Sequence, residues 1–223
     1  MLFRSLFENG AEVKAEGGEY GNALQAASCI GNEQIVKLLL ENGAEVNAMG
    51  GGYGNALQAA SSHWQGNDAI VKLLLENGAD VNAEGGEYGN ALQAASLRGN
   101  LAILNLLLEN GAGVNAEGGK YGNALQAASC EGHEVIVKLL LENGAEANTE
   151  GGEYGNALQA ASFRGNKVIM KLLLENGAEV NTKGGKYGNA LQAATSSAKP
   201  ESSDIDRSSI HRSPNFRQHG IAR

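Results

Sequence analysis

The sequence predicts an all-α fold in which short helix-turn-helix units stack side by side into one elongated solenoid. The first observation behind this prediction is a nine-residue motif, Tyr-Gly-Asn-Ala-Leu-Gln-Ala-Ala-Ser, with copies that begin at Tyr20, Tyr53, Tyr88, Tyr121 and Tyr154. A sixth copy begins at Tyr187 and differs only in carrying Thr195 in place of the final serine. The second observation is the spacing. Successive tyrosines are 33, 35, 33, 33 and 33 residues apart, and a fixed period of this length is typical of stacked repeats.

A third observation is that one unit is too small to fold alone. Five or six large aliphatic side chains in the second half of a unit would contribute roughly 1.5–3 kcal/mol each on burial. Ordering 33 backbones costs about 1–2 kcal/mol each, which is more than this burial supplies. The units must therefore stabilise one another by stacking. Aromatic residues make up only 5% of the chain, so the shared core must consist of Leu, Ile, Val and Ala.

Each unit begins with a short helix, as the copy from Tyr121 to Glu153 illustrates. Asn123 is a suitable N-cap because its side-chain oxygen can accept a hydrogen bond from a free backbone N–H group. The small residues of 124–129 predict a helix that lets a neighbour approach closely, and Gly132 ends it.

The second helix is predicted over 134–142. Its apolar residues occupy nearly every side except Lys138 and Glu142, so we expect it to be covered on all sides. Glu134 and Lys138 form an i,i+4 pair in the favourable order. Gly144 suits the left-handed position after the helix. Residues 145–149 are predicted to be extended, and the glycines at 151–152 to form the turn that leads back.

The repeats divide the chain into an array, 1–195, and a tail, 196–223. The array contains a half-repeat at 1–15, five full repeats that start near 17, 50, 85, 118 and 151, and a terminal half-repeat at 184–195. Residues 5–10 match the end of a second helix, 38–43, by a shift of 33. The tail is rich in Ser and Arg with few large aliphatics, which predicts disorder. Because both ends of the array are half-units, we expect the chain to be a fragment or truncated product of a longer array.

The charge distribution disfavours nucleic acid as a partner. Residues 195–223 contain five basic and three acidic residues, a net charge of +2, whereas the remainder has 12 minus 22, or −10. Affinity for a phosphate backbone depends mainly on cations. We therefore expect no nucleic-acid binding.

Several features favour an intracellular, cytoplasmic location. Charges interrupt the first eight residues too early for a secretory signal, and no apolar run is long enough to span a membrane. Cys29 and Cys130 occupy the same position three repeats apart. Their separation should exceed the reach of a disulfide, and free thiols suit a reducing compartment.

No motif in the sequence indicates catalysis, a cofactor or a metal. The four histidines, His63, His133, His211 and His219, do not share a helix face with one another and a carboxylate, as a metal site would require. The Gly-Gly-Lys-Tyr sequences at Gly118 and Gly184 lack the spacing of a phosphate-binding loop. The sequence therefore predicts a non-catalytic protein with no cofactor and no metal.

The repeat unit resembles the ankyrin repeat. Residues 125–133, Leu-Gln-Ala-Ala-Ser-Cys-Glu-Gly-His, are similar to its Leu-His-x-Ala-Ala-x-x-Gly-His core, and residues 136–148 are similar to its second helix and finger. This chain carries Asn123-Ala124 where the family has Thr-Pro, Gln126 where it has His, Gly151 where it has the finger Asp, and Tyr154 where it has the turn Gly. This variant is similar to arrays in fungal NLR-like (NACHT-ankyrin) receptors.

The resemblance implies an ankyrin-repeat α-solenoid of helix pairs with projecting β-hairpin fingers, followed here by the disordered tail. It also implies a protein–protein interaction module whose partner contacts the fingertips and the ends of the first helices. The copies differ mainly at those two places. The candidate partner-binding residues are therefore Glu16, Glu19, Met49, His63, Trp64, Glu84, Glu87, Leu97, Arg98, Glu117, Lys120, Glu131, Glu150, Glu153, Phe163, Arg164, Lys183 and Lys186.

Each functional interpretation has a structural alternative. The fingertips could form a groove that is acidic in the middle and basic at Lys183 and Lys186, or exposed positions could simply drift. Trp64, which lies on the two-residue insertion, could be a binding hot spot or could pack over a loop. The six tyrosines could form a recognition ladder, although packing of each finger onto its helices is the favoured interpretation. The alternative function is head-to-tail self-association through the complementary half-repeats.

Overall fold

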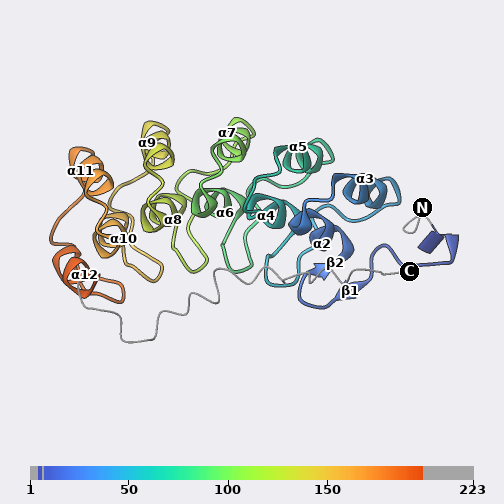
Figure 1. The fold of residues 1–223 in the computed structure, drawn as a ribbon, viewed down its shortest axis with the longest axis horizontal. Coiled ribbons are helices and arrows are strands. Elements are labelled where there is room, and N and C mark those ends of the chain that lie inside the picture. Colours follow the sequence, from blue (N-terminus) through green and yellow to red (C-terminus); the bar gives the residue numbers. More distant parts are fainter. Residues whose placement is uncertain (1–4, 7, 198–223) are drawn as a thin grey trace, which may run out of the picture.

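The computed structural model describes residues 5–6 and 8–197, and these form a solenoid of paired helices with hairpin fingers (Figure 1). The predicted fold class is confirmed. Residues 198–223 of the predicted tail lie outside the described residues. The helix Ala190–Ser197 continues two residues beyond the predicted end of the array.

The helices lie in two layers (Figure 1). One layer contains the first helix of each repeat, namely α2 (Ala23–Ile30), α4 (Ala56–Ser61), α6 (Ala91–Arg98), α8 (Ala124–Glu131), α10 (Ala157–Arg164) and α12 (Ala190–Ser197). The other contains the second helices, namely α3 (Glu33–Glu41), α5 (Asp68–Glu76), α7 (Leu101–Glu109), α9 (Glu134–Glu142) and α11 (Lys167–Glu175). The fingers project from the side of the first layer that faces away from the second helices.

Capping side chains fix where the first helices begin. The predicted N-cap is confirmed, because Asn123 Oδ1 accepts a hydrogen bond of 2.9 Å from the backbone N–H of Gln126. Gly132 ends this helix in the left-handed conformation, with φ of 85°. The same cap recurs before α2, α4, α6 and α10, so the repeated Asn sets the register of each unit.

The second helices bury one face rather than all sides. In α9, Ile136, Val137 and Leu140 are buried, whereas Val135 is 64% exposed. The prediction of full coverage was wrong because the second helices form the outermost layer. They contact first helices and neighbouring second helices, and their outer surface faces solvent.

Two local predictions for this repeat also differ from the structure. Lys138 pairs with Glu142 at 3.7 Å rather than with Glu134. Glu142 lies at the negative end of the helix dipole, which favours a cation there. Residues 145–149 turn instead of remaining extended. Asn115 of the preceding repeat holds the turn by donating to the carbonyl oxygen of Gly144 at 3.0 Å and accepting from the backbone of Glu146 at 2.9 Å.

The fingers are hairpins with minimal strands. The first contains β1 (Glu16–Gly17) and β2 (Gly21–Asn22), paired antiparallel. In the later fingers a single antiparallel bridge joins two glycines, as between Gly118 and Gly122. The Gly-rich sequence permits this tight geometry, because Gly119 at the turn has φ of 59°, a conformation that other residues rarely adopt.

Buried glutamines connect each first helix to the next repeat. Gln93 is 1% exposed, and its Nε2 atom donates to the carbonyl oxygens of Ala116 at 3.0 Å and Gly122 at 3.1 Å. Gln25, Gln58, Gln126 and Gln159 make the equivalent pairs of bonds. A residue type repeated at one position therefore connects successive repeats with buried polar contacts.

Along residues 5–6 and 8–197, no helix combines the length and the apolar character that crossing a lipid bilayer requires.

Candidate functional site

A continuous backbone ladder runs along the fingertips. Each tip residue donates its N–H to the carbonyl oxygen of the corresponding residue in the preceding finger. These bonds are Gly52 to Glu19 at 3.1 Å, Glu87 to Gly52 at 2.9 Å, Lys120 to Glu87 at 3.1 Å, Glu153 to Lys120 at 2.9 Å and Lys186 to Glu153 at 2.8 Å. The ladder holds the fingers in fixed register, so their side chains form one ordered row.

Ion pairs along this row neutralise part of its charge. Glu153 lies 3.3 Å from the Lys186 ammonium and 3.9 Å from that of Lys120. The expected contrast between acidic and basic fingertips is therefore smaller toward the C-terminal end. Other tip residues make no ion pair with any described residue, namely Glu16, Glu19, Glu84, Glu87, Glu117, Glu150 and Lys183. Met49 stands in the outer tip position of its finger and is 45% exposed.

A row of tyrosines lies between the fingertips and the first helices. The rings of Tyr20 and Tyr53 stack with centroids 6.0 Å apart, as do those of Tyr154 and Tyr187. Tyr121 is buried against the small residues of the first helices. Tyrosines of several repeats thus form a second apolar cluster. They pack onto the first helices, and some of them also stack on one another.

Burial changes the acid–base properties of this row. It raises the pKa of the Tyr53, Tyr121 and Tyr154 hydroxyls above the ordinary value of 10.0. It also raises the pKa of the Cys130 thiol. Both cysteines are free thiols. These groups are therefore neutral near pH 7 and serve as packing groups.

The residues at the ends of the first helices pack onto the tyrosine row. Leu97 is buried, and the ring of Phe163 stacks on that of Tyr187 at 4.4 Å. Arg98 donates to the Tyr88 hydroxyl at 3.0 Å. Arg164 donates to Glu131 at 3.0 Å and to the Cys130 sulfur at 3.7 Å. Five of the candidate residues, Leu97, Arg98, Glu131, Phe163 and Arg164, thus have partners inside the molecule.

The insertion in the second repeat presents an aromatic side chain to solvent. Trp64 is 67% exposed, and the His63 ring lies beside it with centroids 6.4 Å apart. His63 is partly buried against Gly31, and desolvation lowers its pKa. In the preceding repeat Ile30 is also largely exposed. The Trp64 side chain is therefore mainly exposed to solvent, with the His63 ring beside it.

His133 has a structural role. Its Nε2 atom lies 2.9 Å from the carbonyl oxygen of Leu97 in the preceding repeat. Asn100 makes the equivalent bond to His63 O at 2.9 Å, and Asn67 makes it to Gly31 O at 3.1 Å. In the described part of the chain, no three His, Cys, Asp or Glu residues are grouped so that they could hold a metal ion.

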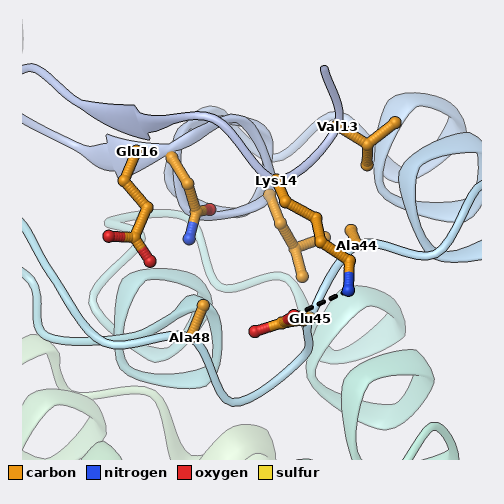
Figure 2. A pocket seen from close by; sticks show the side chains of 8 residues that line it. Val13, Lys14, Glu16, Ala44, Glu45 and Ala48 are labelled. Carbon is orange, nitrogen blue, oxygen red and sulfur yellow. Dashed lines mark hydrogen bonds and ion pairs between the residues drawn. The ribbon is translucent and has the colours of Figure 1, made fainter.

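Two cavities lie along the described region. One lies between the first two fingers, beneath the ion pair of Lys14 with Glu45 at 2.7 Å, and has a volume of about 10 Å³ (Figure 2). That volume accommodates one water at most. A second, more open cavity of about 190 Å³ lies between the α4–α5 and α6–α7 loops, lined among others by Gln65, Asp68 and Leu101. It adjoins the loop that carries Trp64.

Comparison with known proteins now identifies the repeats. A family model for three ankyrin repeats matches residues 2–85 and again 84–151, and a single-repeat model matches residues 156–184. The chain belongs to the ankyrin repeat family. The ankyrin repeat domain of human ASB11 has a similar structure, with a TM-score of 0.71 and 26% sequence identity over 89% of this chain and 92% of that chain. A search of curated proteins finds no match.

Ankyrin repeats are generally protein–protein interaction modules. We define the inner face as three parallel rows: the fingertips, the tyrosines, and the ends of the first helices with the Trp64 loop. Sequence variation between the copies predicted the fingertips and the helix ends as candidate contact positions. The fingertip ladder and the mutual stacking of the tyrosines were not predicted, although both follow from identical residues recurring at one period.

Proposed function

We propose that this ankyrin array is a non-catalytic recognition module that binds another protein through its inner face. The observation that carries the proposal is the exposure of unlike side chains on a face that the repeats otherwise keep regular. Trp64 is exposed on the insertion. Glu84, Glu87, Glu117 and Glu150 are exposed fingertip residues without ion-pair partners in the described part of the chain. Identical repeats supply rigidity, and these residues supply the differences that a partner can recognise.

The internal contacts narrow the set of candidate residues. Leu97 and Phe163 pack in the tyrosine row, so they support the face rather than form its surface. Glu153 forms ion pairs with both Lys120 and Lys186, and exposed ion pairs of this kind contribute little on their own. The proposed contact surface is thus centred on Trp64, Met49 and the tips from Glu84 to Glu117. Trp is enriched among residues that dominate binding energy.

Recognition within a larger protein is part of this proposal. The resemblance of the Tyr-Gly-Asn-Ala-Leu-Gln unit to the arrays of fungal NLR-like receptors supports it. The fixed backbone ladder supports the recognition role itself, because a preorganised surface loses little conformational entropy when it binds.

The experiment immobilises three versions of the array and exposes each to the same protein mixture. Mass spectrometry then identifies the proteins that each version retains. The first is the natural chain. The second carries Trp64→Ala with Glu84→Lys and Glu87→Lys on the inner face. The third is a matched control with Glu41→Lys and Glu109→Lys, which reverse exposed acids on the outer layer. We expect the inner-face variant alone to lose a defined set of proteins. Identical sets from all three arrays would contradict the proposed surface.

A further inference from the structure

The two end faces of the described array carry matching halves of the contacts that join neighbouring repeats. Three sets of cross-repeat contacts recur through the array: the glutamine bonds, the asparagine bonds that hold the turns, and the fingertip ladder. At the last described repeat, the groups that would bond to a following repeat have no such partner among residues 5–6 and 8–197. At the first repeat, the groups that would bond to a preceding repeat likewise have no such partner there.

The fingertip ladder shows this most simply. Each tip from Glu19 to Glu153 accepts a hydrogen bond from the next finger, but the carbonyl oxygen of Lys186 accepts none within the described residues. At the other end the N–H of Glu19 donates none there. The distal end of the ladder therefore offers an acceptor, and the proximal end offers a donor.

The side-chain bonds end in the same way. Asn148 donates to Gly177 O at 2.9 Å and accepts from Glu179 N at 2.8 Å. Its counterpart one repeat later, Asn181, is exposed and makes neither bond in the described region. Gln192, the last of the repeated glutamines, is exposed as well and makes no Nε2 bond to any described residue.

The apolar surfaces at the two ends are also complementary. Leu191 in α12 is 74% exposed, whereas its counterpart Leu158 in α10 is 2% exposed beneath a second helix. Leu6 is 51% exposed, and its counterpart Leu39, which lies in a second helix, is buried. The described residues around Leu6 end like a second helix: Asn9 Nδ2 donates to Ser5 O at 2.7 Å, as Asn42 does to Leu38 O. One end thus presents a first helix and the other presents residues of a second.

We propose that this chain binds a second copy of itself head to tail, so that the last described finger and first helix of one copy stack against the first described finger of the next copy in the register of neighbouring repeats. The residues that would meet have opposite charge. Lys186 of one copy would face Glu19 of the next in the relation that Lys186 and Glu153 have within the chain, where the ion pair measures 3.3 Å. Lys183 would likewise lie in register with Glu16.

The register of the junction follows from the repeat. Placing Glu19 one period after Lys186 puts Tyr20 next to Tyr187, as Tyr187 stands next to Tyr154 with ring centroids 6.0 Å apart. It also places the Ala15 and Gly21 carbonyl oxygens at the positions where Gln192 would donate, by analogy with Gln159 and the carbonyls of Thr182 and Gly188. Each copy keeps one face free, so the assembly is open and does not close into a ring.

Sedimentation velocity of the 223-residue chain over a range of concentrations tests this inference. We expect the weight-average sedimentation coefficient to rise with concentration without levelling off at a dimer, and to fall when salt screens the charges. Leu191→Lys should reduce the association at least tenfold, because it places a charge on the apolar contact. Val135→Lys, which alters another exposed aliphatic side chain away from the ends, should not change it.

A charge exchange gives the sharper test. The variant with Lys183→Glu and Lys186→Glu should associate more weakly than the natural chain, because both of its ends are acidic. The variant with Glu16→Lys and Glu19→Lys should also associate more weakly, because both of its ends are basic. An equimolar mixture should associate more strongly than either variant alone. A concentration-independent monomer for the natural chain, or association unaffected by these exchanges, would overturn the proposal. The inner-face variants serve as controls, since they should still associate, and this separates failure of the two proposals.

Discussion

Gln93 donates a hydrogen bond from its Nε2 atom to the carbonyl oxygen of Gly122, 3.1 Å away in the next repeat. The same nitrogen reaches the carbonyl oxygen of Ala116 at 3.0 Å. Both acceptors belong to the segment that leads into and out of the following finger. A single buried side chain therefore holds the neighbouring finger by its backbone, and this joint recurs with each copy of the motif.

Replacing this side chain should weaken the array. The variant Gln93→Leu keeps a similar volume but leaves the Ala116 carbonyl without its donor, whereas the Gly122 carbonyl keeps the bond from the Gly118 N–H at 2.7 Å. An unsatisfied buried polar group costs about 1–3 kcal/mol. Urea unfolding monitored by circular dichroism measures the change. The matched control is Gln192→Leu, at the same position in the last repeat, where the side chain is exposed. At concentrations at which the chain is monomeric, this control should change the unfolding free energy by no more than about 0.5 kcal/mol. Equal effects at the two positions would contradict the role of the bond.

A glycine that lies against this glutamine should tolerate no side chain. At Gly89, with φ of 92°, an added Cβ would collide with Gln93 Oε1 and lie 2.8 Å from the carbonyl carbon of Gly118. At Gly111, with φ of 85°, no atom lies within 4 Å of the added Cβ. Gly111→Ala should therefore cost only the left-handed conformation, about 1–2 kcal/mol. Gly89→Ala should cost clearly more, because the finger or the glutamine must move. Calorimetric melting of the two variants compares them, and similar losses would argue against close packing at this joint.

The tyrosine row predicts loss of stability at alkaline pH. Burial raises the pKa of Cys130 and of the hydroxyls of Tyr53, Tyr121 and Tyr154 above their ordinary values of 9.0 and 10.0. Above those values the unfolded chain loses protons that the folded chain retains, so stability falls as pH rises. Below pH about 9 these groups stay protonated in both states, so they should not make the free energy of unfolding depend on pH.

Phenolate absorbance followed together with far-ultraviolet circular dichroism checks this pH dependence. We expect the buried tyrosines to ionise only as helical structure is lost, and Tyr154→Phe to make the pH dependence less steep. Ionisation of all six tyrosines near the ordinary value, with the helices intact, would show that the row is open to solvent.

The period and the motif predicted most of the fold, because each depends on local rules. The N-cap at Asn123 and the left-handed Gly132 follow from residue types at the helix ends. Coverage of the second helices was predicted incorrectly. The composition of 134–142 does not show that these helices form an outer layer, so the exposure of Val135 could not be anticipated. The turn at 145–149 depends on Asn115, 31 residues away from Glu146 in the sequence, and no local pattern encodes that contact.

The site was predictable by position but not by environment. Sequence variation between the copies located both the fingertips and the helix ends. It did not distinguish Trp64, which is exposed, from Leu97, which is buried beneath the tyrosine row. That difference arises because the insertion displaces the loop of one repeat, whereas the side chain of Leu97 packs against the neighbouring rings.

The exposure of Trp64 can be tested directly, since it is the only tryptophan in the chain. Iodide and acrylamide should quench its fluorescence nearly as strongly as that of a free tryptophan analogue, because the ring is 67% exposed. Trp64→Phe should leave the unfolding free energy within about 0.5 kcal/mol of the natural chain, as is usual at surface positions. Weak quenching, or a loss of several kcal/mol, would show instead that the ring packs over its neighbours.

Backbone hydrogen exchange at the fingertips tests most directly whether the fingers stack in register to form one ordered face. The tips of isolated hairpins have exposed amides and exchange quickly. In this array Glu87, Lys120 and Glu153 donate their N–H groups to the preceding finger at 2.9–3.1 Å. We predict that these three amides are protected, and that in the monomer Glu19, the first residue of the ladder, is not. Fast exchange at all four positions, while the helices remain protected, would contradict the account, since the fingers would then move independently and could not present one ordered face.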